Sequence, residues 1–513
     1  MRIYYVHPVM VGAVSRWPAV LAACREMEFD YVGTAPLFAP GAFGDIFLTG
    51  DHDAVHPALQ KAQPADEVIG ELCEMCAGFG LKLIIDIVLD RVAVDGQLAS
   101  TRPGWFHTAP PGQAIRIDPR MRRLELGAAC ARFDDPAAAE ELAEWWRGRL
   151  TRLVSVGVAG FRCERPQLVP RSVWRHIIAG ARQASTACRF LAWTPGLQWS
   201  QISALRGAGF DAVFSSLPWW DGRSGWFIEE HELLRQLGPV LAAPEAPFGT
   251  RLARQPGSPG DIALAYKHAL RRAAAIGDGL LIPMGFECAC PHAMDRRQAE
   301  RMDLATAEED RTVDLSKDIR AANVLTHRIA KLGVRGEMRA LTGPGSATTA
   351  VLRANHNDVR YARTAMAILI NSDLSCAHTP PILLDPLPPS AGASFGRPTP
   401  IEEGDPASAL APGEIRLIRV GRSVAVRQRR NDHGLRASLH PHARVSSSIR
   451  SRRRLMAAVL PASASSVSRS RWKPTCSQTA TTCSRLSSSG APSTRMNGNA
   501  CGCSLWATTA GRA

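Results

Sequence analysis

The feature that most constrains the fold is a repeated alternation of short apolar runs and helical patterns between Met1 and Cys290. Each apolar run has the length of a buried strand, and amphipathic segments of helical period lie between most of them. Strands separated by helices form parallel sheets, because each helix returns the chain to the same end of the sheet. Eight such units favour a closed (β/α)8 TIM barrel over a doubly wound sheet, an α/β fold in either case. The expected strands are residues 2–7, 31–35, 81–89, 158–162, 188–193, 212–216, 239–243 and 279–284.

Beyond the barrel the rhythm changes. The predicted barrel domain is 1–333, with an insertion at 93–135 and a last helix at 315–332. Short apolar or alternating runs then follow one another without helices between them, separated by Pro- and Gly-containing loops, which is typical of antiparallel sheets. We therefore expect a small C-terminal β-sandwich domain over residues 334–420. Its strands are expected at 349–354, 365–371 and 414–420.

The net charge of +14 belongs to the end of the 513-residue chain. Residues 421–513 hold 16 of the 61 Lys and Arg residues and one of the 47 acidic residues, Asp432, so 45 basic and 46 acidic residues remain in 1–420. This Ser- and Arg-rich tail has no sustained period and too little apolar content for a core. It is either a disordered basic arm or an out-of-frame translation. A nucleic-acid partner is not expected, since the body of the chain is neutral.

The cysteines and the N-terminal segment bear on metal binding and on the cellular location of the protein. The thirteen cysteines do not form a disulfide framework, and Cys73-Glu-Met-Cys76 and Cys288-Ala-Cys290-Pro-His292 lack zinc spacing. We therefore expect neither a metal nor a cofactor. The chain begins without a signal-peptide pattern, and none of its apolar runs approaches 18 residues. These features predict a cytoplasmic protein without a membrane partner.

Two of the apolar runs end in charged residues. They read Asp86-Ile-Val-Leu-Asp90-Arg91 and Gly157-Val-Ala-Gly-Phe-Arg-Cys-Glu164. A strand enclosed in a barrel delivers such groups to the carboxyl-end rim, where the active sites of these barrels lie. The two segments resemble conserved regions of glycoside hydrolase family 13, the α-amylase family, which read D-x-x-x-N-H and G-F-R-x-D. The resemblance implies the barrel, a small domain after its third strand and a C-terminal β-domain.

Three further matches narrow the resemblance to the branch of maltosyltransferases that extend α-1,4-glucan from maltose 1-phosphate. Their segment F-R-V-D-N-P-x-x-K-P is similar to Phe161-Arg-Cys-Glu-Arg-Pro-Gln-Leu-Val-Pro here. Their F-L-A-E is similar to Phe-Leu-Ala-Trp193, and their N-T-P-D to Glu245-Ala-Pro-Phe248. The nucleophile, proton-donor and third-carboxylate positions of the family thus hold Glu164, Trp193 and Phe248.

These replacements bear on catalysis. A retaining glycosidase needs a nucleophilic carboxylate and a carboxylic acid about 5 Å apart. Glu164 keeps a carboxylate but extends it by one methylene, and a displacement of about 1 Å can cost on the order of 100-fold in rate. Trp193 cannot protonate a leaving group, a loss of about 100- to 10,000-fold. Glu245 and Asp221 are the alternative acids.

The resemblance also implies substrate-binding residues. Arg162 matches the arginine that orients the nucleophile, although an ion pair with Glu164 or Asp86 is equally available. Asp86 matches an aspartate beside the innermost sugar, and Arg91 replaces a substrate-contacting histidine, with pairing to Glu164 the favoured alternative. Five of the twelve tryptophans fall in the loops after the fifth and sixth strands, where flat aromatic faces suit a glucose ring, although packing as core is an alternative for several. They are Trp193, Trp199, Trp219, Trp220 and Trp226, of which Trp193, Trp219 and Trp220 are the predicted substrate contacts.

Two functions stay open from the sequence. The favoured one is a catalytically impaired barrel of glycogen and maltose metabolism that binds α-glucan or malto-oligosaccharide, or another protein of glycogen metabolism. The other is an active α-glucan transferase or hydrolase with a rearranged set of carboxylates. Glu164 is the candidate catalytic residue in both.

Overall fold

The computed structural model contains the predicted barrel. The residues it describes are 1–108, 118–120, 127–254, 258–297, 313–380, 382, 384, 387–402 and 405–423. They lie within one compact unit of the chain, Met1–Arg427. The predicted tail lies outside the described residues from 424 onward.

Eight parallel strands close into a barrel in the order β1-β13-β12-β11-β10-β9-β5-β2. All eight predicted strands are present, so the (β/α)8 fold is confirmed. Every residue of β13 is buried, as expected for a strand enclosed between barrel interior and helices. The barrel strands are β1 (Arg2–Val6), β2 (Tyr31–Thr34), β5 (Lys82–Ile87), β9 (Gly160–Cys163), β10 (Arg189–Ala192), β11 (Ala212–Phe214), β12 (Val240–Ala242) and β13 (Gly279–Pro283).

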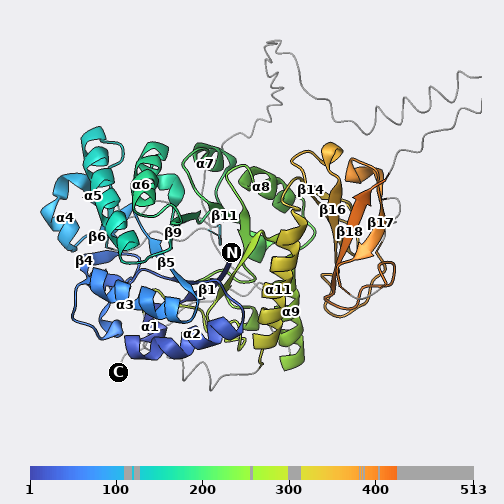
Figure 1. Cartoon of the computed structure of the whole chain (residues 1–513), viewed down its shortest axis with the longest axis horizontal. Helices are drawn as coiled ribbons and strands as arrows, with labels where there is room; N and C mark the ends of the chain where they lie inside the picture. The colour runs from blue at the N-terminus through green and yellow to red at the C-terminus, as the bar shows by residue number, and fades with distance from the viewer. Residues whose placement is uncertain are drawn as a thin grey trace, which may run out of the picture. The chain divides into compact units, whose positions relative to one another are not determined.

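Helices surround the strands (Figure 1). The local sequence explains where several begin: Asp135 accepts hydrogen bonds from the first free amides of α5, and Ser258 and Asp261 form a capping box at α9. A capping box of Gln198 and Gln201 starts α7. The α-helices are α1 (Pro8–Val11), α2 (Trp17–Glu26), α3 (Ala65–Gly78), α4 (Gln97–Thr101), α5 (Pro136–Ser155), α6 (Arg171–Ala184), α7 (Trp199–Ala204), α8 (Trp226–Leu234), α9 (Pro259–Ile276) and α11 (Ser316–Leu332).

The loops after β2 and β5 carry small sheets of their own. A hairpin, which the sequence analysis did not predict, follows β2. The predicted insertion contributes a three-stranded antiparallel sheet, and residues 109–117 and 121–126 of that insertion lie outside the described part. These strands are β3 (Phe38–Pro40) and β4 (Thr49–Val55) in the hairpin, and β6 (Arg91–Ala93), β8 (Ala128–Ala131) and β7 (Phe106–Thr108) in the insertion.

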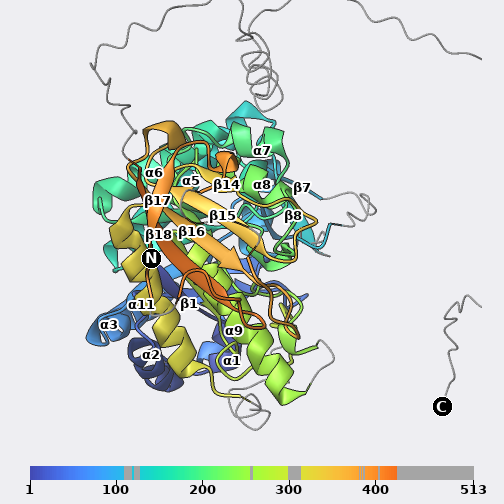
Figure 2. The ribbon, with the colours of Figure 1, turned by 90° about the vertical axis from the view of Figure 1, so that its right-hand side faces the viewer.

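The C-terminal β-domain is built on one antiparallel sheet of order β14-β15-β16-β18-β17 (Figure 2). Alternate residues of β16 belong to two different cores: Met366, Ile368 and Ile370 pack with the barrel, and their neighbours pack with the domain's own loops. Among the described residues, the second layer over the sheet consists of loops and a short helix, Pro389–Ala391. The strands are β14 (Met338–Ala340), β15 (Thr349–Ala354), β16 (Thr364–Ile370), β17 (Phe395–Pro400) and β18 (Ile415–Arg422).

Buried polar contacts join this domain to the barrel. Arg353 on β15 pairs with Asp278 before β13 at 2.6 Å and donates to the carbonyl of Ala275 at 3.1 Å. His268 on α9 contacts the carbonyl oxygen of Gly413 at 2.9 Å.

None of the helices in the described ranges combines the length and the apolar character that crossing a membrane requires.

Candidate active site

The predicted site residues meet at the carboxyl-end rim of the barrel. Asp86 near the end of β5 lies in register with Arg162 on the neighbouring strand β9. Glu164 directly follows β9, and all three side chains are almost fully buried, at 1% exposure each. The prediction that Asp86 and Glu164 share this rim is therefore confirmed.

Arg162 holds both carboxylates. Its Nε donates to Asp86 Oδ1 at 2.7 Å, its Nη2 pairs with the second oxygen of Asp86, and the same nitrogen lies 3.1 Å from Glu164 Oε1. Burial disfavours the Arg162 cation, but Asp86, Tyr5 and Glu164 together outweigh burial and raise the Arg162 pKa well above its ordinary value. Burial also raises the pKa of Asp86, against the opposing charge of Arg162. The sequence left open an ion pair of Arg162 with Glu164 or Asp86, and the structure shows ion pairs with both carboxylates.

Tyr5 completes the cluster from the opposite side of β2. Its hydroxyl donates to Asp86 Oδ2 at 2.5 Å and accepts from Arg162 Nη2 at 3.0 Å. Gly33 on β2 leaves the space for this ring, because a Cβ there would lie 3.3 Å from Tyr5 Cδ2 and 3.0 Å from Ile3 Cγ2. Sequence analysis missed Tyr5. Its approach to Asp86 becomes visible only once the barrel closes and places β1 next to β2.

Trp193, which the resemblance predicts at the family's proton-donor position, directly follows β10. Its ring centroid lies 4.7 Å from the guanidinium carbon of Arg162, and the Tyr5 ring lies 4.6 Å from that carbon. Trp193 also packs on Phe214 at 5.1 Å between ring centroids and is buried. Two aromatic rings thus contact the cation that two carboxylates bind, an arrangement that stabilises a desolvated guanidinium.

Phe248, which the resemblance predicts at the third-carboxylate position, lies in the loop after β12. Its backbone is in the left-handed region, at φ 61°, which is uncommon for a residue with a bulky side chain. The ring packs against Phe47 at 5.2 Å, His7 at 5.5 Å and Tyr5 at 6.2 Å between centroids. The surroundings of the Phe248 ring are therefore aromatic.

Arg91 lies in a second buried ion pair. Its Nη1 is 2.6 Å from Asp90 Oδ1, and Arg165 Nη1 is 3.8 Å from Asp90 Oδ2. The structure thus places the Arg91 cation on its sequence neighbour Asp90; the pairing with Glu164 stays a prediction.

The two nominated acids are engaged elsewhere. Glu245 is buried, pairs with Arg251 at 2.9 Å and accepts from the backbone of Leu252 at 2.6 Å. Asp221 is exposed and caps its own turn by accepting from Ser224; its slight burial opposes the shift, but these hydrogen bonds lower its pKa. A general acid needs a raised pKa, so the environment of Asp221 does not suit proton donation. Glu245 is held by its ion pair with Arg251.

Glu230 on α8 is a buried carboxyl that the sequence analysis missed. It accepts from the hydroxyl of Ser216 at 2.6 Å and from the Ser216 backbone at 2.9 Å, just beyond β11. Burial raises its pKa, although the hydrogen bonds from Ser216 oppose the shift. In a sequence, a glutamate in a helical segment is expected to face solvent. Its burial in the structure is what makes Glu230 a candidate acid.

The tryptophans divide into core and surface. Trp220 is buried and stacks on Phe227 at 4.6 Å between centroids, while Trp219 and Trp226 are partly buried. Trp199, the first residue of α7, is 63% exposed. Of the three predicted substrate contacts, Trp193 and Trp220 therefore pack as core, and the exposed aromatic face in this region is that of Trp199.

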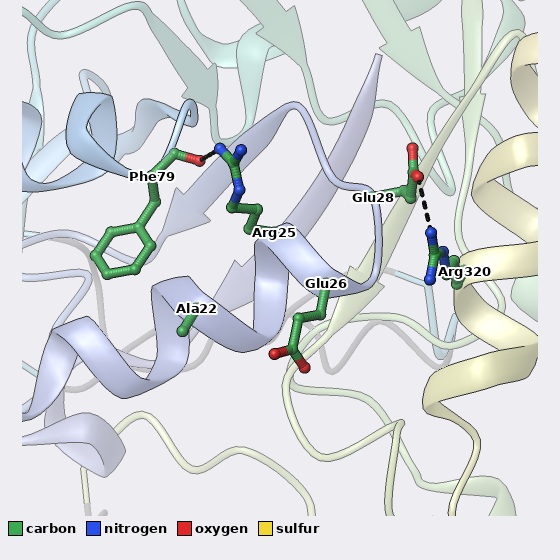
Figure 3. Close-up of a pocket in the computed structure, with 6 residues that line it drawn as sticks. All are labelled: Ala22, Arg25, Glu26, Glu28, Phe79 and Arg320. Atoms are coloured by element: carbon green, nitrogen blue, oxygen red, sulfur yellow. Dashed lines mark hydrogen bonds and ion pairs between the residues drawn. The ribbon is translucent and has the colours of Figure 1, made fainter.

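A cavity of about 520 Å³ lies away from this site, between α2 and α11 (Figure 3). Arg25, which donates to the carbonyl of Phe79 at 2.8 Å, and Glu28, which pairs with Arg320 at 3.5 Å, contribute to its wall. Because α2 ends where β2 begins, the cavity lies at the amino end of the barrel, opposite the rim that carries catalytic groups in this fold. Among the described residues, no three metal-ligating side chains converge.

The fold is similar to that of solved α-amylase-type barrels. The α-amylase of Geobacillus thermoleovorans, solved with acarbose, matches with a TM-score of 0.58 and 14% identity over 82% of this chain and 98% of its own. The trehalose-6-phosphate hydrolase of Bacillus licheniformis matches with a TM-score of 0.59 and 10% identity over 82% of this chain and 99% of its own. At such identities the likeness shows the fold.

The sequence comparison is more specific. The α-1,4-glucan:maltose-1-phosphate maltosyltransferase of Burkholderia pseudomallei is 33% identical over 456 residues, 85% of this chain and 40% of the relative. Maltosyltransferase 2 of Streptomyces coelicolor is 24% identical over 46% of this chain and 36% of its own length. The chain thus spans about two fifths of these relatives. No family model matches it. The resemblance predicted from the strand ends, to the maltosyltransferases of glycoside hydrolase family 13, is confirmed.

Proposed function

We propose that this chain is a maltosyltransferase-like barrel of α-glucan metabolism that binds glucan with little or no turnover. The observation that carries the proposal is Trp193, which contacts Arg162 where the family places its proton donor. An indole N–H does not supply a proton to a leaving oxygen at neutral pH. The proposal includes a link to glycogen, a partner protein of glycogen metabolism and a cytoplasmic location, as the sequence predicts.

The surroundings of Glu164 support the same conclusion. Its carboxylate is buried and lies 3.1 Å from Arg162 Nη2, and that arginine is bound to Asp86 as well. Phe248 adds an apolar ring in place of a third charge that would support a distorted sugar. The site retains one of the three carboxylates of the family pattern, and retaining chemistry needs at least two.

Turnover is the direct test. Purified protein, given maltose 1-phosphate and α-glucan, should turn over about 100- to 10,000-fold more slowly than the Burkholderia relative, because the general acid is missing. Glu164→Gln should lower this residual rate further and leave the glucan affinity unchanged. Product formation by chromatography and glucan affinity by calorimetry would measure both.

The competing function is an active transferase or hydrolase with a rearranged acid, and the buried Glu230 favours it. If the wild type turns over briskly and Glu164→Gln abolishes turnover, Glu164 is a working nucleophile and the impaired reading is wrong. Glu230→Gln would then test the acid, with Glu229→Gln as the matched control on the same helix.

Glucan binding is assigned to the exposed aromatic surface after β10. Trp199 offers a flat face to solvent, and Leu168 on the adjoining short helix Pro166–Leu168 is also exposed. An indole face stacks on the apolar face of a glucose ring, while the buried rings of Trp193 and Trp220 offer no such surface.

Trp199→Ala should therefore weaken malto-oligosaccharide binding by about tenfold, the effect of losing roughly 1.4 kcal/mol of contact energy. Tyr361→Ala is the matched control, because Tyr361 is equally exposed but lies on the C-terminal β-domain. Equal affinities for both variants would show that the glucan does not contact Trp199.

A further inference from the structure

Two exposed apolar side chains lie together where the hairpin after β2 meets the insertion after β5, at the carboxyl-end rim of the barrel. Phe43, in the loop between β3 and β4, is 51% exposed, and Val94, directly after β6, is 40% exposed. Both border Gly127: the Val94 amide donates to the Gly127 carbonyl at 2.8 Å, and a Cβ on Gly127 would overlap Cδ2 and Cε2 of the Phe43 ring. The Phe43 ring therefore rests on the protein along one side, and about half of the residue stays open to solvent.

The loop that carries Phe43 is fixed against the insertion. The Gly44 amide donates to the Gly41 carbonyl at 2.9 Å, and the Ala42 amide donates to Asp95 Oδ2 at 2.7 Å. A Cβ on Gly41 would overlap Ala93 Cβ and Asp95 Oδ1, so the turn packs closely on the insertion. Strand β4 of the hairpin also lies against β6 and α4 (Figure 1). A ring on a loop held in this way loses little freedom when a ligand binds, which favours binding.

The same loop leads to the candidate active site. Four residues after Phe43, the buried ring of Phe47 packs on Phe248 at 5.2 Å between centroids, and Phe248 in turn packs on Tyr5. Four residues of fully extended chain span at most about 14 Å. Phe43 therefore belongs to the surface around the candidate site and not to a remote face of the barrel.

The size and chemistry of this surface fit a sugar ring better than a protein. A stable protein interface buries about 800 Å² and about 20 residues or more on each partner. Among the described residues, the exposed large apolar side chains at this place are two, Phe43 and Val94. The exposed carboxylate of Asp95 follows Val94 directly. A flat ring beside a polar group matches one glucose unit, whose apolar face stacks on the ring and whose hydroxyls bond to the carboxylate.

We propose that Phe43 is a second aromatic contact for α-glucan at the rim of the barrel. This inference rests on the proposed function, because it assigns a further residue to the same ligand. Trp199 follows β10 and Phe43 follows β2, and strands β9 and β5 lie between these two in the barrel. The two rings thus contact the glucan from loops on different parts of the rim.

Replacing the ring tests the contact. Phe43→Ala should weaken maltoheptaose binding by about fivefold, the effect of losing one stacked ring. Phe43→Trp keeps a flat ring and should retain the wild-type affinity, whereas Phe43→Leu keeps only an apolar side chain and should bind as weakly as Phe43→Ala. Tyr361→Ala is the control, because Tyr361 is also an exposed aromatic residue but lies on the C-terminal β-domain. Calorimetry on the whole chain measures the affinities, and circular dichroism checks that each variant is folded.

The outcomes separate this contact from the proposed function. If Phe43→Ala binds maltoheptaose as well as Tyr361→Ala does, while Trp199→Ala binds more weakly, the Phe43 contact is wrong and glucan binding stands. If Phe43→Leu binds as well as wild type, the ring does not stack on a sugar. If Phe43→Ala changes only the self-association of the chain in sedimentation, the surface is a contact between copies instead. If the wild type binds no maltoheptaose, the proposed glucan binding fails together with this contact.

Discussion

On acidification from pH 6.5 to about pH 4, this protein should unfold, with most of the lost stability arising from buried histidines. Besides that of His56, burial lowers the pKa of four imidazoles, to about 4 for His7 and His268 and to about 3 for His52 and His231. His52 shows the cause clearly, since its ring packs against both Trp145 and Trp146, at 5.0 Å and 5.4 Å between centroids. Each of these rings is neutral in the folded state at pH 5.

Stability falls with decreasing pH because the unfolded chain binds more protons than the folded protein. In the unfolded chain a histidine binds a proton below about pH 6.5, whereas these four bind it in the folded state only near pH 3 to 4. Their stabilising effect is therefore complete above pH 6.5 and is lost as the pH falls. Each histidine costs about 1.4 kcal/mol per pH unit over that interval, so the four together cost roughly 5 kcal/mol per unit. Total stabilities of about 5–15 kcal/mol would be consumed between pH 6 and about pH 4.

His231 offers the cleanest variant. Neither of its ring nitrogens has a hydrogen-bond partner among the described residues, and it lies near Phe227, with ring centroids 6.4 Å apart. The charged groups that act on it are Arg353, Asp278 and Arg235. His231→Phe removes a titrating ring without removing a hydrogen bond.

This variant should unfold at lower pH than wild type, with about one proton fewer taken up in the transition. Circular dichroism against pH and urea would measure both quantities. His327→Gln, at an exposed position on α11, is the control and should leave the acid midpoint unchanged. If His231→Phe and His327→Gln behave alike, the burial of His231 does not govern acid stability.

The barrel was predictable from the sequence because enclosed parallel strands are apolar along their whole length. All eight strands were predicted, while β14 and β17 of the C-terminal sheet were not. β14 has three residues, and β17 contains Pro398 and Pro400, which argue against a strand unless it lies at a sheet edge. β17 does lie at the edge of its sheet.

The candidate site was predictable only in part. Strand ends located Asp86, Arg162 and Glu164, because the carboxyl ends of parallel strands meet at one rim. Side-chain contacts across the barrel interior carry no sequence signal, so the role of Tyr5 was missed. The pairing of Arg91 with Asp90 was missed as well, since residues next to each other in a regular strand point to opposite faces and the chain departs from that pattern after β5.

Replacement of Arg162 by methionine should destabilise the folded protein by about 3–5 kcal/mol at neutral pH, since it leaves Asp86 and Glu164 buried without their shared cation. Methionine keeps much of the aliphatic volume between Tyr5 and Trp193, so the cost reports on charge more than on packing. Urea unfolding followed by tryptophan fluorescence would measure the change.

A surface arginine provides the control for this variant. Arg182 pairs with Asp211 at 2.9 Å but is about one third exposed, so Arg182→Met should cost less than about 1 kcal/mol. Adding Asp86→Asn to Arg162→Met should recover part of the lost stability, because an amide needs no counter-cation. If Arg162→Met costs no more than Arg182→Met, then water reaches the two carboxylates in solution and the rim cluster is open enough for a sugar hydroxyl. The explanation of low turnover would then have to rest on Trp193 and Phe248 alone.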